Sequence, residues 1–522
     1  MAPEAPAYEI TIQSPPSVTA QRHRPASPPR SLSALRGMCD YDPFYLPASL
    51  PMNLQLSTDE DQLLRAIGAC AKTLNVPAYA VGGFVRDKVI GRYAGDIDIV
   101  CVGSGIALAE EVARRLPDAR KVKVYSRFGT AMVRVGEEDI EFVGARRESY
   151  NRDSRKPVVE DGTLGDDQLR RDFTINALGM SLAEEDFGAV VDPFDGLGDI
   201  ERRIIRTPRD PDQTFDDDPL RMLRAVRFAA QLGFEIHAET KAAIGRFAER
   251  LTIISPERKH TELNKILLSP KPSVGLALLS ETGLLREVLP ELEAMHGVDR
   301  RGGVGHKDNF WHTLEVVDNL AQVSDDLWLT WAALLHDVGK PRTKKFEGGT
   351  WTFHGHEMVG AKMVPKIFQR LRLPMDEQMK FVKRMVRFHQ KPIALCDEVV
   401  TDSAIRRLLF DLGDDIDDLL MLCEADITSK NPSKVKRYLK NYRALRQRIK
   451  DVEERDHLRN WEPPISGEDI MNAFGIKPGP QVGVIKSAIR EAVLEGDIPN
   501  DRTAAWALML RKGEELGLSP VG

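Results

Sequence analysis

Gly95-Asp96-Ile97-Asp98-Ile99-Val100, with Val81-Gly82-Gly83-Phe84-Val85-Arg86-Asp87 just before it, is the stretch of this 522-residue chain on which its fold depends. From Asp96 onward, carboxylates alternate with β-branched residues, which predicts a strand. Residues two apart share a strand face, so Asp96 and Asp98 should point one way while Ile97 and Ile99 enter a core. Two carboxylates at this spacing suit Mg²⁺, which keeps waters and substrate phosphates as its other ligands.

The glycine pair upstream adds a second chemical signal. Gly82 and Gly83 would let backbone amides approach an anion closely, and Arg86 could add a charge-assisted bond to a phosphate. Glycines, an arginine and two strand carboxylates together predict metal-assisted phosphoryl or nucleotidyl transfer. Taken alone, the carboxylate pair is equally compatible with a solvated strand face.

Composition limits the classes of protein that fit. The net charge of -6 excludes a uniformly basic nucleic-acid coat, so RNA contact must come from local patches. Five cysteines, odd in number and never in C-x-x-C, argue against a disulfide framework and predict a reducing, cytoplasmic setting. No apolar run is long enough to span a bilayer, so no membrane partner is expected. Composition does not predict the oligomeric state.

The surrounding segments predict a small mixed α/β domain with a curved sheet. The first helix should begin at a capping box, Ser57-Thr-Asp-Glu60. The expected elements are helices over 57–73 and 106–116 and strands over 121–125, 130–135 and 139–143. Glu141, on the last strand, is either a third carboxylate facing the metals or an ordinary solvent-facing residue.

Two arginines then precede an aspartate in Leu169-Arg-Arg-Asp-Phe-Thr-Ile-Asn-Ala-Leu178. Arg170 and Arg171 would suit contact with a triphosphate, and Asp172 or Asn176 would be free to bond a ribose hydroxyl. The alternative is a helix N-terminus with a surface ion pair.

A helix should begin at Pro219, after three aspartates. Arg221, Arg224 and Arg227 recur every third residue, which places them along one side of that helix. The opposite side is expected to carry Leu220, Leu223 and Phe228. Three aligned arginines are costly to hold together without an anionic partner, so they predict either a polyphosphate site or a salt-bridged surface.

The order of five motifs resembles the class II tRNA nucleotidyltransferase and bacterial poly(A) polymerase family. These motifs are G-G-x-V-R-D, D-x-D, R-R-D-F-T-I-N-A, D-P-F-D-G and D-D-P-L-R-M-L-R-A-V-R-F. The resemblance covers roughly residues 54–269. It implies that Asp96 and Asp98 hold catalytic Mg²⁺, with Glu141 as a further candidate. The nucleotide contacts that it implies are Gly82, Gly83, Arg86, Asp87, Arg171, Asp172, Asn176, Asp218, Arg221, Arg224 and Arg227.

Within that family, an E-D-x-x-R element presents protein side chains to the base of CTP or ATP. Asp218 and Arg221 match this element, and a carboxylate and a guanidinium can read the exocyclic amine, ring nitrogens and carbonyl of a base. Asp217 stands where the family usually has glutamate.

A second set of potential metal ligands begins at residue 310. In the order His, His-Asp and a distant Asp, it resembles the HD metal-dependent phosphohydrolase domain. The resemblance implies metal ligation by His312, His336, Asp337 and Asp426. Lys340 would lie near the scissile phosphate, with His356 and His389 as phosphate or second-metal contacts. Imidazole and carboxylate together suit a divalent transition metal.

Beyond Asp426, a strongly basic run with interleaved tyrosines is the best candidate for RNA-backbone contact in an acidic protein. Its predicted RNA-binding residues are Lys434, Lys436, Arg437 and Lys440. The alternative is a solvated helix face.

The chain is therefore predicted to be an α+β protein. The expected parts are a disordered tail over 1–50, a nucleotidyltransferase head with a small mixed sheet over 51–193, a helical neck and body over 194–300, an HD domain over 301–430 and a helical RNA-binding region over 431–522.

The predicted function is template-independent addition of CCA to the tRNA 3′ end from CTP and ATP with Mg²⁺, with phosphohydrolysis at the HD site as a second activity. One rival is a poly(A) polymerase, although Tyr125-Ser-Arg-Phe-Gly-Thr-Ala131 is closer to the tRNA branch. Others are an enzyme that adds only CC or only A, and an HD phosphohydrolase with an RNA-binding head.

Overall fold

The computed structural model describes residues 54–93, 95–126, 129–151, 154–397, 401–429, 431–457, 459 and 461–521. The tail expected over 1–50, and Arg127 and Phe128, lie outside these residues. Within them, no helix combines the length and the apolar character needed to cross a membrane.

A seven-stranded mixed sheet forms the front domain, in the order β3-β4-β5-β2-β1-β8-β9. The β2–β5 pair is parallel, and the other neighbouring pairs are antiparallel. The strands are β1 Ala78–Val81, β2 Ile97–Cys101, β3 Lys123–Tyr125, β4 Thr130–Val135, β5 Glu138–Gly144, β8 Gly179–Ser181 and β9 Val190–Val191. This sheet and the helices after it confirm the predicted α+β class.

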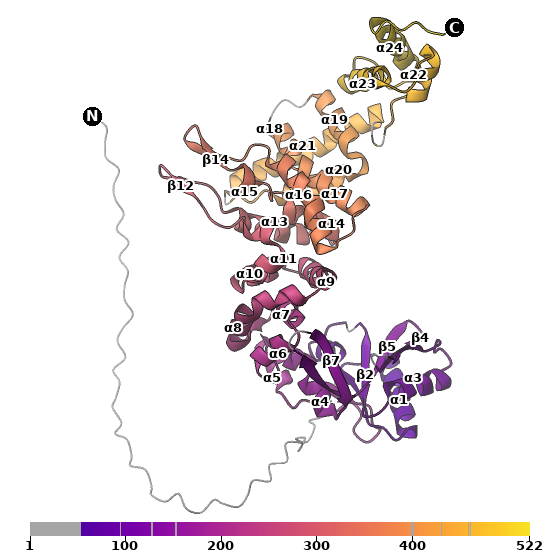
Figure 1. The fold of residues 1–522 in the computed structure, drawn as a ribbon, viewed down its shortest axis with the longest axis vertical. Helices are drawn as coiled ribbons and strands as arrows, with labels where there is room; N and C mark the ends of the chain where they lie inside the picture. Colours follow the sequence, from indigo (N-terminus) through magenta and orange to yellow (C-terminus); the bar gives the residue numbers. More distant parts are fainter. Residues whose placement is uncertain are drawn as a thin grey trace, which may run out of the picture. The chain divides into compact units, whose positions relative to one another are not determined.

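Helices α1 (Thr58–Thr73) and α3 (Gly105–Arg115) pack against the sheet (Figure 1). Ile97 and Ile99 of β2 are buried in the core, as the alternating pattern predicted. Asp98 lies beside Glu141 in the β2–β5 register, so both carboxylates share the opposite face of the sheet. The predicted capping box of α1 is also present, with Ser57 and Glu60 bonding each other's backbone amides.

Short elements connect the sheet to the helices that follow. Glycine-led α2 (Gly83–Val89) comes directly after β1, and β6 (Arg146–Asn151) pairs antiparallel with β7 (Ser154–Asp161). The other elements are α4 Leu164–Leu169, α5 Gly196–Arg202, β10 Ile204–Ile205, α6 Pro211–Asp217, α7 Leu220–Leu232, β11 Glu235–Ile236, α8 Ala238–Phe247, α9 Pro256–Leu267, α10 Pro272–Glu281, α11 Leu284–Val288 and α12 Pro290–Glu293.

The next group of helices carries the second set of ligands. Two short two-stranded ribbons accompany it, β12 Arg300–Arg301 with β13 Val304–Gly305 and β14 Lys345–Glu347 with β15 Thr350–Thr352. The helices are α13 Asn309–Ala321, α14 Leu327–Leu335, α15 Lys340–Thr343, α16 His356–Leu371, α17 Glu377–Phe388, α18 Lys391–Asp397, α19 Asp402–Leu412, α20 Ile416–Ala425 and α21 Pro432–Asp456.

Three C-terminal helices have a small core of their own, which includes Phe474, Ile485 and Met509. They are α22 Gly467–Phe474, α23 Pro480–Glu495 and α24 Arg502–Glu515. A capping box of Ser466 and Asp469 begins α22.

Candidate active site and metal centre

A cavity of about 750 Å³ lies over the polar face of the sheet. Strand, loop and helix residues all contribute to its wall, including α7. The predicted site residues that line it are Gly82, Gly83, Arg86, Asp87, Asp96, Asp98, Glu141, Arg171, Asp172, Asn176, Asp218, Arg221, Arg224 and Arg227. The structure thus brings together every residue predicted for the front site.

The carboxylates on the floor of this cavity repel one another. Burial raises the pKa of Asp98 to about 6; Arg171 opposes this rise, while Glu141 and Asp96 add to it. Asp98 is half-buried and Asp96 is exposed. Such a group of carboxylates fits a divalent cation, because the cation would neutralise charge that the protein leaves uncompensated.

Gly82 is required by its surroundings. Its backbone is left-handed, with φ of 75°, and an added Cβ would lie 2.9 Å from Nη1 of Arg171 and 3.6 Å from Oδ2 of Asp98. Any side chain here would enter the space between these charged groups.

The amide of Gly82 does not face an anion site, contrary to the prediction. It donates to the carbonyl of Leu178 at 3.2 Å. This bond ties the end of β1 to the neighbouring chain segment. Gly83, by contrast, is the first residue of α2 and lines the cavity.

Arg86 is held rigidly at the cavity wall. Its Nη1 donates to Oδ1 of Asn176 at 2.6 Å, and its other nitrogens donate to both carboxylate oxygens of Asp87 at 2.9 Å. Its guanidinium also lies 5.0 Å from the ring centroid of Phe228. Asp87 therefore orients the arginine that the sequence analysis expected at the nucleotide.

Asp172 and Asn176 are engaged inside the protein. Asp172 accepts from Arg224 Nε at 2.6 Å through one oxygen, and from Asn176 and the amide of Phe173 through the other. The side-chain oxygen of Asn176 accepts from Arg86. The expectation that one of them is free for a ribose hydroxyl is wrong, because both link arginines to the wall.

A buried carboxylate, Asp167, anchors the two arginines of the R-R-D motif, and the sequence analysis missed it. Asp167 is fully buried and accepts from Arg170 and from Nη2 of Arg171, the latter at 3.0 Å. Burial would raise the pKa of Asp167, but the two arginines outweigh burial and lower it. Its spacing of three and four residues from them was the available signal.

The arginines of α7 line the cavity instead of an open surface. Arg221 donates through Nη2 to the carbonyl of Arg170 at 2.6 Å, and its buried Nη1 has no partner among the described atoms. Arg227 pairs with Glu262 of α9 at 3.0 Å, and burial lowers the pKa of Arg227 to about 10. Glu262 was not predicted.

Phe228 was expected on the side of α7 opposite the arginines, but it lies beside them. The guanidinium of Arg227 lies 4.2 Å from its ring centroid and that of Arg224 lies 5.5 Å away. The ring lines the same cavity, because residues 224 and 228 are one turn apart on α7.

Asp217, the last residue of α6, and Asp218, between α6 and α7, have different surroundings. Asp218 lines the cavity, and its carboxylate accepts from the amide of Leu220 at 3.1 Å. Asp217 pairs instead with Arg209 and is not part of the cavity wall.

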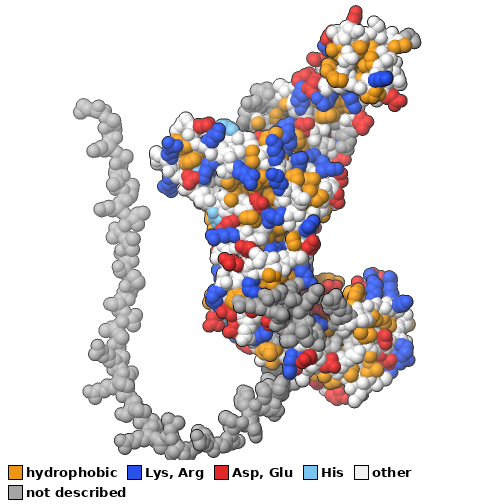
Figure 2. All heavy atoms as spheres, viewed as in Figure 1, with side chains coloured by type: hydrophobic (Ala, Val, Ile, Leu, Met, Phe, Trp, Pro, Cys, Tyr) orange, Lys and Arg blue, Asp and Glu red, His pale blue; other side chains and the backbone are white. Residues whose placement is uncertain are grey.

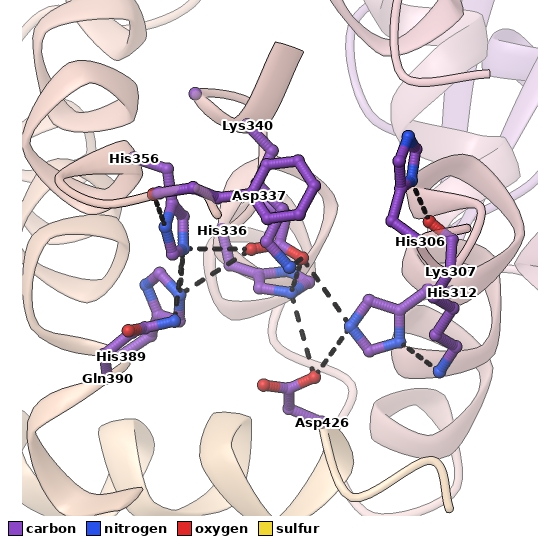
Figure 3. A network of polar contacts seen from close by, with 12 residues as sticks. His306, Lys307, His312, His336, Asp337, Lys340, His356, His389, Gln390 and Asp426 are labelled. Carbon is purple, nitrogen blue, oxygen red and sulfur yellow. Dashed lines mark hydrogen bonds and ion pairs between the residues drawn. The ribbon is translucent and has the colours of Figure 1, made fainter. Parts of the chain in front are cut away.

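The second site, called the HD centre here, consists of four histidines and two aspartates (Figure 3). They are His312, His336, Asp337, His356, His389 and Asp426. All but His312 stand at a helix end or within two residues after one. This geometry brings together all four ligands that the sequence predicted and the two added histidines.

Asp337 lies between two groups of ligands in the HD centre. Its Oδ2 is 3.2 Å from Nε2 of His336 and 3.6 Å from that of His312, and its Oδ1 is 3.2 Å from Nε2 of His356. Asp426 completes the first group at 2.9 Å from His312, and His389 completes the second. Lys340 donates to Asp337 at 2.5 Å.

Backbone carbonyls fix the orientation of three of the histidines. The Nδ1 atoms of His336, His356 and His389 each lie 2.7–2.9 Å from the carbonyl oxygen three residues earlier in the chain. These contacts at Nδ1 direct the Nε2 atoms at the centre, as in metal-ligating histidines. Burial and the neighbouring histidines lower the pKa of His389 to about 4, which keeps it neutral. These donors fit a transition-metal ion well.

The basic run forms α21, and its two halves differ. The predicted residues Lys434, Lys436, Arg437 and Lys440, and also Arg443, are exposed and form no ion pair with a described residue. In the second half, Arg446 pairs with Glu424, and Arg448 pairs with Asp402. Figure 2 shows basic and acidic side chains interspersed over the visible face, so positive charge is local, as the net charge predicted.

Three family models match the chain. They are the "Poly A polymerase head domain" over residues 78–206, the "Probable RNA and SrmB- binding site of polymerase A" over 233–295 and the "HD domain" over 309–424.

Similar proteins of known name and structure cover most of the chain. A CC-adding tRNA nucleotidyltransferase of Thermus thermophilus is 34% identical over 84% of this chain and 94% of its own length. An A-adding tRNA nucleotidyltransferase of Deinococcus radiodurans is also 34% identical, over 67% of this chain and 80% of its own length. The crystal structure of the Bacillus stearothermophilus CCA-adding enzyme in complex with CTP has a TM-score of 0.59 and 25% identity, and covers 87% of this chain and 98% of that chain.

Proposed function

This chain belongs to the tRNA nucleotidyltransferase and poly(A) polymerase family, and on that premise we propose that it adds CCA to the 3′ end of tRNA, taking CTP and ATP as substrates. One observation carries this proposal: Asp96 just before β2, Asp98 on β2 and Glu141 on β5 share a cavity with the α7 arginines. The cavity therefore combines a cation site with an anion-binding wall, as transfer from a nucleoside triphosphate requires.

Asp96 and Asp98, with Glu141 beside them, would hold Mg²⁺. The bound ion would supply positive charge for the attacking hydroxyl and for the departing pyrophosphate. The chain's own part is to orient the triphosphate. Arg171, braced by Asp167, and Arg224, braced by Asp172, are fixed donors that need little rearrangement on binding.

Base choice would fall to Asp218 and Arg221. The unpartnered Nη1 of Arg221 is a buried donor that a base acceptor could satisfy. The carboxylate of Asp218 can accept from an exocyclic amine, which both cytosine and adenine carry.

Incubation with tRNA that lacks its CCA end, Mg²⁺ and labelled CTP and ATP, separately and together, tests this function. Addition of two C and one A, followed by a stop, is expected. A long A tail would assign poly(A) polymerase activity. Incorporation of C alone or A alone would assign a partial enzyme, as the names of the two relatives at 34% identity illustrate.

The HD centre supports a second candidate function, hydrolysis of phosphate esters with a divalent transition metal. Three histidines with fixed Nδ1 atoms and the shared carboxylate of Asp337 form a prepared set of ligands. A bound metal ion would activate water for attack on phosphorus. Lys340 would place its charge near the phosphate.

A further inference from the structure

A second cavity, of about 520 Å³, adjoins the HD centre and is lined mainly by apolar groups. Asp426 of the HD centre and Lys307, whose Nζ lies 2.9 Å from Nδ1 of His312, are part of its wall. The rings of Tyr438 and Tyr442, one turn apart on α21, also line it. Its volume is in the range of small-ligand sites. It therefore offers an aromatic, ring-sized space beside the place where a phosphate would be cleaved.

Tyr442 is a fixed part of the cavity wall. It is only 2% exposed, and its hydroxyl interacts with the neighbouring thiol of Cys423. That thiol in turn donates to the carbonyl of His389 at 2.9 Å. The side chain of Tyr442 is therefore held in place beside the HD centre.

The unpaired half of α21 continues from this cavity. A neighbouring hollow of about 450 Å³ shares Ser429 with it and is lined by Lys436 and Arg443. Both cations are exposed and form no ion pair with a described residue, whereas Arg446 and Arg448 further along the helix are paired. Lys436 and Arg443 thus leave positive charge beside this hollow that no described carboxylate neutralises.

We propose that the Tyr438–Tyr442 cavity holds the terminal base of an RNA strand, with its end phosphate at the HD centre and the preceding backbone phosphate at Lys436 and Arg443. A free mononucleotide would leave this second phosphate site unused, so the observations favour a strand end. The proposal rests on the proposed phosphohydrolase function of the HD centre, but its test measures binding alone.

The probe is a fluorescently labelled trinucleotide RNA with a 3′-phosphate, bound to the full chain in EDTA so that no metal-dependent turnover occurs. Fluorescence anisotropy gives its affinity for wild type and for Tyr438→Ala, Tyr442→Phe and the double variant Lys436→Ala/Arg443→Ala. Lys450→Ala, an exposed cation on the same helix beyond the hollow, is the matched control.

We expect Tyr438→Ala to weaken binding roughly tenfold, since stacking of a base on an aromatic ring contributes that order of affinity. Tyr442→Phe keeps the ring and removes only the hydroxyl beside Cys423, so it should bind the trinucleotide as tightly as wild type. The double variant should lower the affinity for the trinucleotide more than the affinity for a nucleoside 3′-monophosphate, which is measured in the same way. Lys450→Ala should match wild type with both probes.

Equal affinities in wild type and all three variants would overturn the proposal. If Lys436→Ala/Arg443→Ala loses affinity for the monophosphate and for the trinucleotide to the same extent, the cavity does not hold a strand end, and the site is assigned to a mononucleotide. If binding follows the expected pattern but the protein with added metal hydrolyses no phosphate ester, the phosphohydrolase function fails while the binding site stands.

Discussion

Gly82 and Arg171 approach so closely that a methyl group on the glycine would stand 2.9 Å from the guanidinium. A residue with a Cβ would also be strained here, because the backbone φ of Gly82 is 75°. Arg171 also lies near enough to Asp98 to oppose the rise in its pKa. The glycine thus sets the spacing between a predicted triphosphate contact and a predicted metal ligand.

Gly82→Ala should therefore lower the rate of nucleotide addition by about a hundredfold, because small displacements of positioning groups have effects of that order. Gly83→Ala is the matched control, since its added Cβ would meet Arg86 only at an ordinary 3.6 Å. Single-nucleotide incorporation from labelled CTP measures both. Equal rates in the two variants would show that the Gly82–Arg171 spacing does not matter.

Asp98→Asn should abolish nucleotide addition and leave the metal-free protein as stable as wild type or more so. The reason is that burial and two neighbouring carboxylates disfavour the charge that the substitution removes. Thermal unfolding in EDTA and CTP incorporation with Mg²⁺ are the two measurements. Asp139→Asn, exposed on β5, serves as control and should keep full activity. Retained addition in Asp98→Asn would contradict the metal site.

Asp172→Asn should destabilise the protein at neutral pH by about 2 kcal/mol. Burial would raise the pKa of Asp172, but Arg224 and Asn176 outweigh burial and lower it from 3.8 to about 2. A depressed pKa in the folded state means that the carboxylate stabilises the fold above pH 4 and loses this contribution as the pH falls toward 2.

Denaturant unfolding of wild type and Asp172→Asn at pH 7 and near pH 3 tests this, with the difference expected to shrink at the lower pH. Asp212→Asn is the control, because Asp212 forms an exposed ion pair with Arg246. It should change the free energy of unfolding by less than about 0.5 kcal/mol. A pH-independent difference would show that the charge of Asp172 is not the cause.

Asp217 and Asp218 should separate in their effect on base choice. Asp217→Ala should keep the ratio of CTP to ATP use, because its side chain pairs with Arg209 outside the cavity wall. Asp218→Ala should lower the preference for CTP and ATP over UTP by tenfold or more, because uracil lacks the exocyclic amine from which Asp218 would accept, and a lost hydrogen bond to a base contributes on the order of 1–3 kcal/mol. Initial rates with each nucleotide measure the ratio. Altered discrimination in Asp217→Ala would restore a role for the residue at the family's glutamate position.

The sequence predicted local features well and long-range pairings poorly. The alternation around Asp98 places it on a strand face because strand periodicity is a local property. Asp167 and Glu262 could not be assigned, since a buried carboxylate is recognised only by the arginines that fold against it. The engagement of Asp172 inside the protein was missed for the same reason: its partner Arg224 is 52 residues away.

The basic helix shows the same limit. Charge counting treated α21 as one surface, but acidic residues of other helices neutralise its second half, as Asp402 does for Arg448. For the HD centre, by contrast, the four residues predicted as ligands do lie together, because the order of its motifs is distinctive. Backbone bonds to Nδ1 could not be read from it, since they depend on helix-end geometry.

Asp337→Ala should remove metal and phosphatase activity from the HD centre while leaving CCA addition within about twofold of wild type. Its carboxylate faces both groups of ligands, so its loss affects each of them. Metal content after dialysis and hydrolysis of a generic phosphate ester measure the first effect, and labelled CTP and ATP incorporation measures the second. Asp98→Ala is the reciprocal control and should lose addition while keeping hydrolysis. Loss of both activities in either variant would contradict two independent sites, because each substitution is expected to act only on the metal held by its own carboxylates.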